Sequence, residues 1–380
     1  MGDLWLEDIL GEKALKWVEK EKKQVLATFG DPKASPLYSN LLNASTSKHK
    51  VPYVTSCDGY LYGHWTDTQN PRGLWRRTTL EEYVKLVPQW EILLDIDALG
   101  REEKQSWVWE GVEFLECGLR DRALIQLSPG GTDATVVREY NLTDKCFVTK
   151  DPFIVPLGKL SVCWKTRDIL WVGSDFGEGS LTDSGYPRLL KEWKRGTSLL
   201  EAPIIFSGET TDMCVAGNVS YDHAHVYEWL TRMITFYETV VYLRQENKWL
   251  ELKVPRSAEI GTFCDQLLIT LRADWLGYKE GSLLAISLSA FLAESHNFVV
   301  LFAPTSTTSL SNQVDLQHFL VLEILDTVKS TLCFWKYTCG NWIRLSTNRT
   351  SDQKYSGFPL LHKKPTSRTG ASVTTSFRQP

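Results

Sequence analysis

The stretch that decides the fold reads Ile169-Leu-Trp-Val-Gly-Ser-Asp175, then Arg188-Leu-Leu-Lys-Glu-Trp-Lys194, then Ile204-Ile-Phe-Ser-Gly-Glu209. Each run is short and rich in apolar or aromatic residues, which is typical of β-strands separated by turns. Similar sets of three runs recur elsewhere in the chain: Tyr60–Trp65, Gly73–Thr78 and Glu91–Asp97; Leu267–Arg272, Gly281–Leu288 and Phe298–Pro304. With a fourth strand in each unit, the pattern repeats about every 45–55 residues, which is the period of a propeller blade.

Outward from this stretch, the same pattern divides most of the chain into repeated units. Five lie near residues 51–100, 106–157, 160–208, 213–256 and 259–305, and a sixth begins at 307. We therefore predict an all-β fold, a β-propeller with about six blades. A β-sandwich is the structural alternative, but about 250 residues of strands and turns exceed one sandwich.

The N-terminal residues have a helical pattern instead. Residues 12–29 place six apolar side chains on one arc, and Gly30-Asp31-Pro32 then ends the predicted helix. The six are Ala14, Leu15, Val18, Val25, Leu26 and Phe29. A second helix is predicted around Ser35–Asn43, and a short helical insertion at Leu80–Tyr83.

Three domains follow from these patterns. They are a helical segment over residues 1–48, an incomplete propeller over 51–345, and a tail over 346–380. The tail is rich in Ser, Thr, Lys and Arg and has neither a strand nor a helix period, so we predict that it is disordered. Two interpretations of the tail stay open: an unstructured tail without a specific role, or a basic arm that interacts with a partner.

The composition excludes several classes of function. The 380 residues carry 42 Lys and Arg against 46 Asp and Glu, a net charge of −4. No strong basic field favours nucleic acid as a partner.

The longest mostly apolar run, Ser282–Ala293, is too short to span a bilayer, so no membrane partner is expected. The first residues do not resemble a signal peptide, which favours a cytoplasmic protein. None of the eight cysteines has Cys-x-x-Cys spacing, so we expect reduced thiols and no zinc ribbon.

No catalytic or metal-binding motif stands out. A nucleophilic serine on an α/β-hydrolase sheet needs Gly-x-Ser-x-Gly, because small neighbours permit the strained turn, and no serine here has glycine at both positions. His223 and His225 beside Asp222 resemble part of a metal site, but no third ligand is spaced near them. The acids of Asp95-Ile-Asp97 follow an apolar strand and are predicted to end it in a turn. We therefore predict no catalytic residue, no metal and no cofactor.

One long loop is a candidate for function. The segment from Asp175 to Arg188 separates two predicted strands and combines glycines, aromatics and acids. Loops of this length are often lids or interface loops, although simple blade-loop geometry would also explain it. The candidate residues for controlling substrate access or contacting another domain are Asp175, Phe176, Glu178, Asp183, Tyr186 and Arg188.

Several collinear motifs resemble the prolyl oligopeptidase family of serine peptidases. The similarity extends over roughly residues 3–345, and the 174–188 segment closely resembles a bacterial-type branch of the family. The motifs are Trp5-Leu-Glu-Asp8, Ala14-Leu-Lys-Trp-Val18, Pro71–Tyr83, Trp90–Leu99, Trp107-Val-Trp109, Ser174–Arg188, Glu259–Phe263 and Gly281–Ile286.

This resemblance implies more than the residues alone establish. Members of the family have a seven-bladed propeller, which limits access to short peptides, and a C-terminal α/β-hydrolase domain that holds the catalytic Ser, Asp and His. It implies that the N-terminal helices pack on the hydrolase domain and that the 174–188 loop lies near the domain interface. The chain ends while the sixth blade is being completed, so no catalytic residue can be transferred to it.

Three functional interpretations follow. The first is the propeller domain of a serine-type oligopeptidase that hydrolyses short peptides, inactive by itself, with short peptides or a missing or separate hydrolase domain as partners. The alternatives are a non-catalytic propeller that binds a peptide or protein, and a truncated gene product. Composition does not separate the two alternatives.

Overall fold

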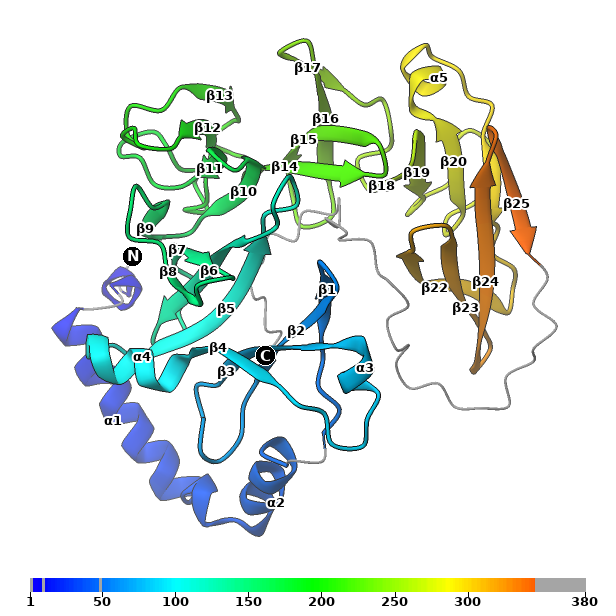
Figure 1. Cartoon of the computed structure of the whole chain (residues 1–380). Coiled ribbons are helices and arrows are strands. Elements are labelled where there is room, and N and C mark those ends of the chain that lie inside the picture. Colours follow the sequence, from blue (N-terminus) through cyan, green and yellow to red (C-terminus); the bar gives the residue numbers. More distant parts are fainter. Residues whose placement is uncertain (1–2, 9–10, 48–49, 346–380) are drawn as a thin grey trace. The chain divides into compact units, whose positions relative to one another are not determined.

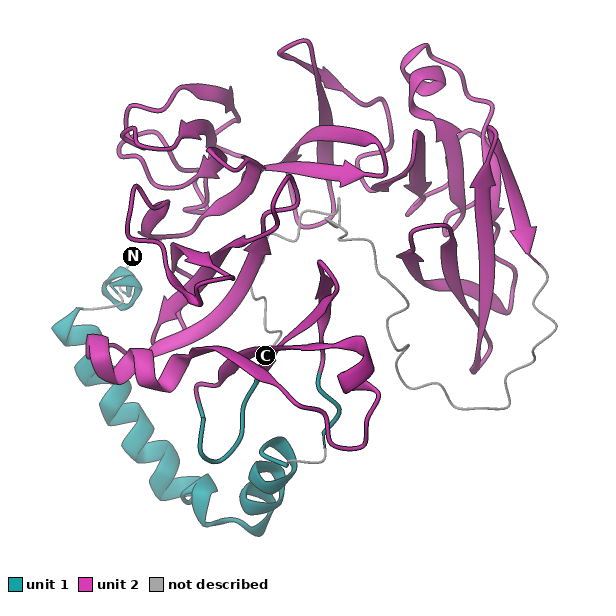
Figure 2. Ribbon diagram, viewed as in Figure 1, with its two compact units in different colours: residues 1–52, 65–71 teal, residues 53–64, 72–380 magenta. Residues whose placement is uncertain are grey.

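The computed structural model describes residues 3–8, 11–47 and 50–345. The chain divides into two compact units, residues 1–52 with 65–71 and residues 53–64 with 72–380, which Figure 2 colours separately. The predicted disordered tail over 346–380 lies outside the described residues. The predicted domain boundaries at residues 48 and 51 stay predictions.

The first unit holds the N-terminal helices. They are η1 (Leu4–Glu7), α1 (Glu12–Phe29), η2 (Pro32–Ala34) and α2 (Pro36–Ser45). The predicted helix over 12–29 is confirmed, and it ends at Gly30, whose φ of 80° suits glycine and whose N–H donates to the Leu26 carbonyl. The second predicted helix is also confirmed, because the Ser35 hydroxyl accepts the Tyr38 N–H and begins α2, which ends two residues beyond the prediction.

The apolar arc of α1 is largely open to solvent. Ala14 is buried, whereas the other five side chains of the arc are exposed, from 37% at Leu26 to 83% at Phe29. Exposed leucines follow on α2 at Leu37, Leu41 and Leu42. This many exposed large apolar side chains on two neighbouring helices of the sequence favour an interaction surface.

The second unit is built from antiparallel sheets, and Figure 1 labels most of their strands. The described residues form six of them, and in five the hydrogen-bonded order follows the chain order. The first contains β1 (Thr55–Cys57), β2 (Tyr60–Trp65), β3 (Leu74–Thr79) and β4 (Glu91–Asp95). The second contains β5 (Trp107–Phe114), β6 (Arg122–Pro129), β7 (Thr135–Asn141) and β8 (Cys146–Phe147), with β9 (Ile154–Gly158) also paired to β7.

The remaining four sheets repeat the four-stranded pattern. The third contains β10 (Ser161–Thr166), β11 (Ile169–Gly173), β12 (Leu189–Lys194) and β13 (Ile204–Ser207). The fourth contains β14 (Cys214–Asp222), β15 (His225–Met233), β16 (Thr239–Gln245) and β17 (Lys248–Glu251). The fifth contains β18 (Glu259–Phe263), β19 (Gln266–Thr270), β20 (Leu283–Ser287) and β21 (Val299–Phe302). The sixth contains β22 (Thr308–Asp315), β23 (Leu320–Asp326), β24 (Lys329–Thr338) and β25 (Asn341–Leu345).

The core consists of apolar layers between consecutive sheets. Leu267 and Ile269 of β19 pack with the fourth sheet, whereas Leu268 between them packs with the sixth. The same alternation places Trp164 in the layer next to the second sheet and Trp171 in the layer next to the fourth. Sheets buried on both faces require nearly continuous apolar runs, which is the pattern of the quoted strands. The all-β propeller fold is therefore confirmed, and the seventh blade that the resemblance implies stays a prediction.

Two short connections begin with capping side chains. The predicted insertion is confirmed as α3 (Leu80–Tyr83), where the Thr79 hydroxyl accepts the Glu82 N–H. The predicted turn at Asp95-Ile-Asp97 is wrong, because α4 (Ile96–Glu103) starts there. The Asp95 carboxylate accepts the Ala98 N–H at 2.8 Å, so this acid begins a helix as an N-cap. A last short helix, α5 (Leu288–Leu292), follows β20.

Candidate functional site

The loop between β11 and β12 is held in one shape by its own polar groups. The Ser180 hydroxyl is buried, donates to the Gly177 carbonyl at 2.6 Å and accepts the Phe176 N–H at 2.8 Å. The Asp175 carboxylate accepts the Gly177 N–H at 2.9 Å. Gly177 has a φ of 104°, which L side chains rarely adopt, so glycine is required at this position. The loop is therefore a preformed structural feature.

Arg188 joins the loop to the connection between the third and fourth sheets. Its Nε donates to the Gly179 carbonyl at 2.9 Å, and its Nη1 donates to the Gly208 carbonyl at 3.0 Å. The backbone adds a contact from the Gly208 N–H to the Arg188 carbonyl at 2.9 Å. Because the Arg188 guanidinium donates to backbone carbonyls, the first role of this side chain is to hold the loop in place.

Further contacts fasten the middle of the loop to the same connection. The Asp183 N–H donates to the Thr210 carbonyl at 2.8 Å, and the Thr182 hydroxyl donates to the Met213 carbonyl at 3.1 Å. Two lysines lie over the loop aromatics, with the Nζ of Lys191 4.4 Å from the Phe176 ring and that of Lys159 4.2 Å from the Tyr186 ring. Such cation–π contacts add modest stabilisation at the ends of the loop.

The six predicted loop residues therefore have different structural positions. Asp175 and Arg188 bond to the backbone, and Phe176 and Tyr186 are half-buried against lysines. Glu178 and Asp183 have exposed side chains. The loop presents a contact surface with two acids and contains no assembled set of catalytic groups. Its influence on access or on domain contact stays a prediction.

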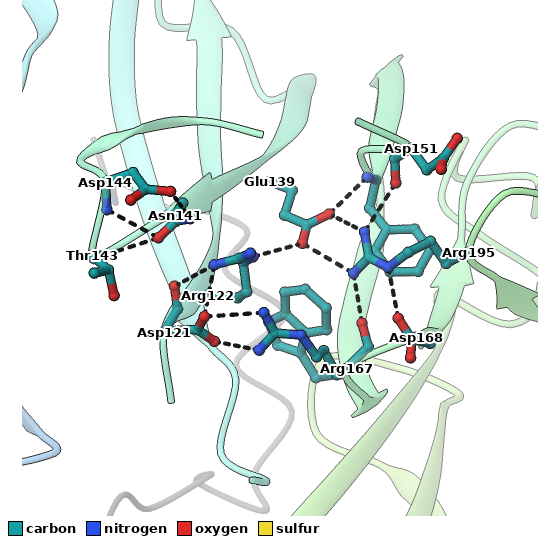
Figure 3. A network of polar contacts seen from close by, with 12 residues as sticks. Asp121, Arg122, Glu139, Asn141, Thr143, Asp144, Asp151, Arg167, Asp168 and Arg195 are labelled. Carbon is teal, nitrogen blue, oxygen red and sulfur yellow. Dashed lines mark hydrogen bonds and ion pairs between the residues drawn. The ribbon is translucent and has the colours of Figure 1, made fainter. Parts of the chain in front are cut away.

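A network of charges between the second and third sheets was not predicted from the sequence (Figure 3). Its centre is Glu139 of β7, whose side chain is fully buried. The carboxylate is held by Arg195, with Nη1 2.7 Å from Oε2 and Nη2 3.0 Å from Oε1, and it also accepts the Phe153 N–H at 3.0 Å. Arg122 approaches the same carboxylate at 3.5 Å.

The rest of this network extends the link between the two sheets. Arg195 donates in addition to the Asp151 and Arg167 carbonyls, at 3.0 and 2.6 Å, and to the Asp168 carboxylate at 2.8 Å. Arg167 in turn forms a two-pronged contact with Asp121, as Figure 3 shows. A buried carboxylate with this many charge-assisted bonds fixes the geometry of the two sheets, because removal of one partner leaves an uncompensated charge.

A second charged cluster lies between the third and fourth sheets. Lys165 reaches Glu192 at 2.9 Å and Glu228 at 3.3 Å, and Arg244 lies 3.3 and 3.4 Å from the same two carboxylates. The cluster borders a surface depression of about 310 Å³ lined by Val226, Glu228, Arg244, Glu246 and Asn247. The charges balance within the cluster, so it serves first as a link between the sheets.

Glu113 of β5 differs from these paired acids. Burial raises the pKa of its carboxyl from 4.5 to about 8, and the nearby Glu116 carboxylate adds to the rise. The unfolded carboxyl ionises near pH 4.5, whereas the folded one keeps its proton until about pH 8. The folded state therefore binds more protons in this window, and the stabilisation from Glu113 is lost as the pH rises through it.

Replacement of Glu113 with glutamine is expected to flatten the pH dependence of stability between pH 5 and 8. At pH 8 the variant should be more stable by about 1–2 kcal/mol, less than the full pKa shift implies, because the half-buried side chain keeps some solvent contact. Urea unfolding at pH 5, 6.5 and 8 measures this, with exposed Glu102→Gln as the control. Parallel profiles for Glu113→Gln and the unsubstituted protein would contradict the prediction.

The histidine pair considered for a metal does not form such a site. Among residues 3–8, 11–47 and 50–345, no group of three His, Cys, Asp or Glu side chains could hold a metal ion. The His225 ring stacks on Tyr227 with ring centroids 5.8 Å apart, while His223 contacts Asp222 and a distant turn. Within the same described residues, no helix has the length and apolar character needed to cross a membrane.

The match to known families covers nearly the whole chain. The model of the prolyl oligopeptidase N-terminal β-propeller domain matches residues 4–348. An uncharacterized peptidase of Sinorhizobium fredii is 32% identical over 354 residues, which are 89% of this chain and 48% of that protein. An uncharacterized peptidase of Rickettsia prowazekii is 29% identical over 327 residues, 79% of this chain and 45% of that protein. The chain thus spans about half the length of these curated relatives.

Solved structures agree with this match. A post-proline cleaving enzyme from Rickettsia typhi superimposes with a TM-score of 0.81 at 25% identity, over 91% of this chain and 53% of that one. Oligopeptidase B from Leishmania major has the same fold, with a TM-score of 0.63 at 11% identity over 90% of this chain and 48% of that one. By its sequence match and its stacked sheets, the chain belongs to the prolyl oligopeptidase family and corresponds to its N-terminal β-propeller domain.

Proposed function

We propose that this chain supplies the propeller part of a serine-type oligopeptidase that hydrolyses short peptides. The family match over residues 4–348 carries the proposal, and the similarity to a post-proline cleaving enzyme supports peptides as the substrate class. The 380 residues contain no Gly-x-Ser-x-Gly motif, so the catalytic Ser, Asp and His would come from an α/β-hydrolase domain outside them. By itself the chain has no peptidase activity in this proposal.

The exposed arc of α1 supports a hydrolase domain as the partner. Five apolar side chains of one helix face solvent, and covering them would remove their apolar surface from water. Lys20 lies outside this arc and is 69% exposed in its side chain. Substitutions on the apolar arc of α1 and at Lys20 on its polar face therefore form a matched pair for testing contact with a hydrolase domain.

The loop from Asp175 to Arg188 would contribute a second contact or restrict access. Its backbone is fixed by Arg188 and Ser180, so little conformational entropy would be lost when a partner binds. The exposed Glu178 and Asp183 side chains are the groups that this loop offers to a partner or a peptide.

The proposal is tested by mixing the purified chain with the part of the Rickettsia typhi enzyme that this chain does not cover. The chain alone should not cleave a Gly-Pro fluorogenic peptide. The mixture should elute as a complex, and any turnover should be abolished by a serine-directed phosphonate. Turnover by the chain alone that the phosphonate abolishes would overturn the proposal.

Two variants locate the contact. Val18→Glu combined with Val25→Glu should weaken the complex, because it places charges on the apolar arc, whereas Lys20→Glu should leave it unchanged. A monodisperse chain that binds peptides but no hydrolase domain would favour the alternative, a non-catalytic binding module.

A further inference from the structure

The turn between β14 and β15 contains a histidine that joins two other sheets. The Nδ1 of His223 lies 2.6 Å from Oδ1 of Asp222, and its Nε2 lies 2.8 Å from the carbonyl oxygen of Gln317. Gln317 belongs to the turn between β22 and β23, in the sixth sheet. The contact therefore connects residues 94 positions apart in the chain.

The fifth sheet takes part in the same junction. The Asp222 carboxylate, which is buried, also accepts the N–H of Cys264 at 3.1 Å, and Cys264 lies in the turn between β18 and β19. The ring of Phe263 lies 5.2 Å from the imidazole, at an interplanar angle of 62°. His223 has a φ of 55°, so its position depends on these contacts, because the left-handed region is unfavourable for a residue with a side chain.

Both nitrogens of this imidazole face hydrogen-bond acceptors. A carboxylate oxygen and a peptide carbonyl oxygen have no proton to give, so each contact needs an N–H on the ring. Neutral imidazole has one N–H and could satisfy only one of the two contacts, whereas imidazolium satisfies both. The imidazolium charge would also compensate the buried carboxylate of Asp222.

We propose that His223 is a proton-dependent latch that ties the β14–β15 turn to the turns of the fifth and sixth sheets. Protonation closes the latch, because both ring nitrogens then donate. Loss of one proton leaves a single N–H on the ring, so the hydrogen bond to either Asp222 or the Gln317 carbonyl is lost and the joined turns open more often. The ring is accessible to solvent protons, since 26% of its side chain is exposed.

Other titratable groups lie on or directly beside the three turns that meet here. They are Asp222 and His225 beside His223, Cys264 and Asp265 in the fifth sheet, and Asp315 and His318 beside Gln317. Among them, His225 offers a matched control, because it begins β15 two residues after His223 and stacks on Tyr227 instead of bridging sheets. A pH effect that comes from the turn in general would depend equally on both histidines.

Amide hydrogen exchange on the full chain tests the latch. The Leu316 N–H donates to the Phe319 carbonyl within the sixth-sheet turn, and the Cys264 N–H donates to Asp222. Their protection factors should fall about tenfold when the pH rises from 6 to 8.5, as expected for loss of one charge-assisted hydrogen bond. In His223→Gln the protection should be low at both pH values, and in His225→Gln the fall should persist.

Long-range proton–nitrogen NMR spectra of the imidazoles give an independent readout. At pH 6 both nitrogens of His223 should carry protons, and this measurement needs no variant that must fold. Equal protection at pH 6 and 8.5 in the unsubstituted chain would overturn the latch. So would a neutral His223 ring at pH 6, or loss of the pH effect in His225→Gln.

Discussion

Replacing Glu139 with glutamine is expected to lower the free energy of unfolding by about 3–5 kcal/mol, the usual cost of breaking a buried ion pair by removing one partner. The substitution keeps the size of the side chain and an oxygen for the Phe153 N–H. It removes the negative charge that faces Arg195 and Arg122, whose side chains are only 20% and 16% exposed. The two guanidinium groups would then remain close together without their shared counter-charge.

Urea unfolding of the full chain measures this effect, and Asp168→Asn is the matched control. Asp168 bonds to the same Arg195, but its side chain is 63% exposed, so its removal should cost no more than about 1 kcal/mol. Similar costs for the two substitutions would contradict the view that burial of Glu139 makes this contact important.

The sequence predicts the elements of this fold better than the contacts between them. The bounds of α1 follow from the apolar spacing before Gly30, and the strand runs follow from apolar residues that face both neighbouring sheets. The prediction of a turn at Asp95 is wrong because aspartate is common both in the turns that end strands and at the first position of helices. The helix differs from a turn in the sequence only by the apolar residues Ile96 and Leu99, which α4 buries. Two such residues in a short segment do not establish a helical period.

In the candidate site, too, the sequence predicts where an element lies better than which contacts it makes. The loop from Asp175 to Arg188 was located by its length and composition, and the structure places it between β11 and β12. The role of Arg188 could not be read from the sequence, because its acceptors are backbone carbonyls, which every residue has. Glu139 and Arg195 are 56 positions apart, so their pairing depends on how the second and third sheets stack.

Trp171→Ala is expected to have the second large effect, a loss of about 3–5 kcal/mol of stability. The indole is fully buried in the layer between the third and fourth sheets. Its Nε1 donates to Glu192 at 2.9 Å, and its ring lies 5.6 Å from that of Trp249. Truncation leaves a cavity and removes a donor from the charged cluster. Trp171→Phe should cost less, about 1–2 kcal/mol, because it fills most of the space and loses mainly the N–H bond.

Gly217 provides a direct test that the cost comes from packing. A Cβ at this position would lie 2.8 Å from Cε3 of Trp171 and 2.6 Å from Cδ2 of Leu190, so Gly217→Ala should destabilise the protein by about 1–3 kcal/mol. In the Trp171→Ala background the same methyl group would enter the new cavity, and its cost should shrink. Equal costs of Gly217→Ala in the two backgrounds, measured by urea unfolding in a double-mutant cycle, would show that the two residues do not share this space. Unequal costs would mean that the glycine of one sheet allows the tryptophan of its neighbour to be buried.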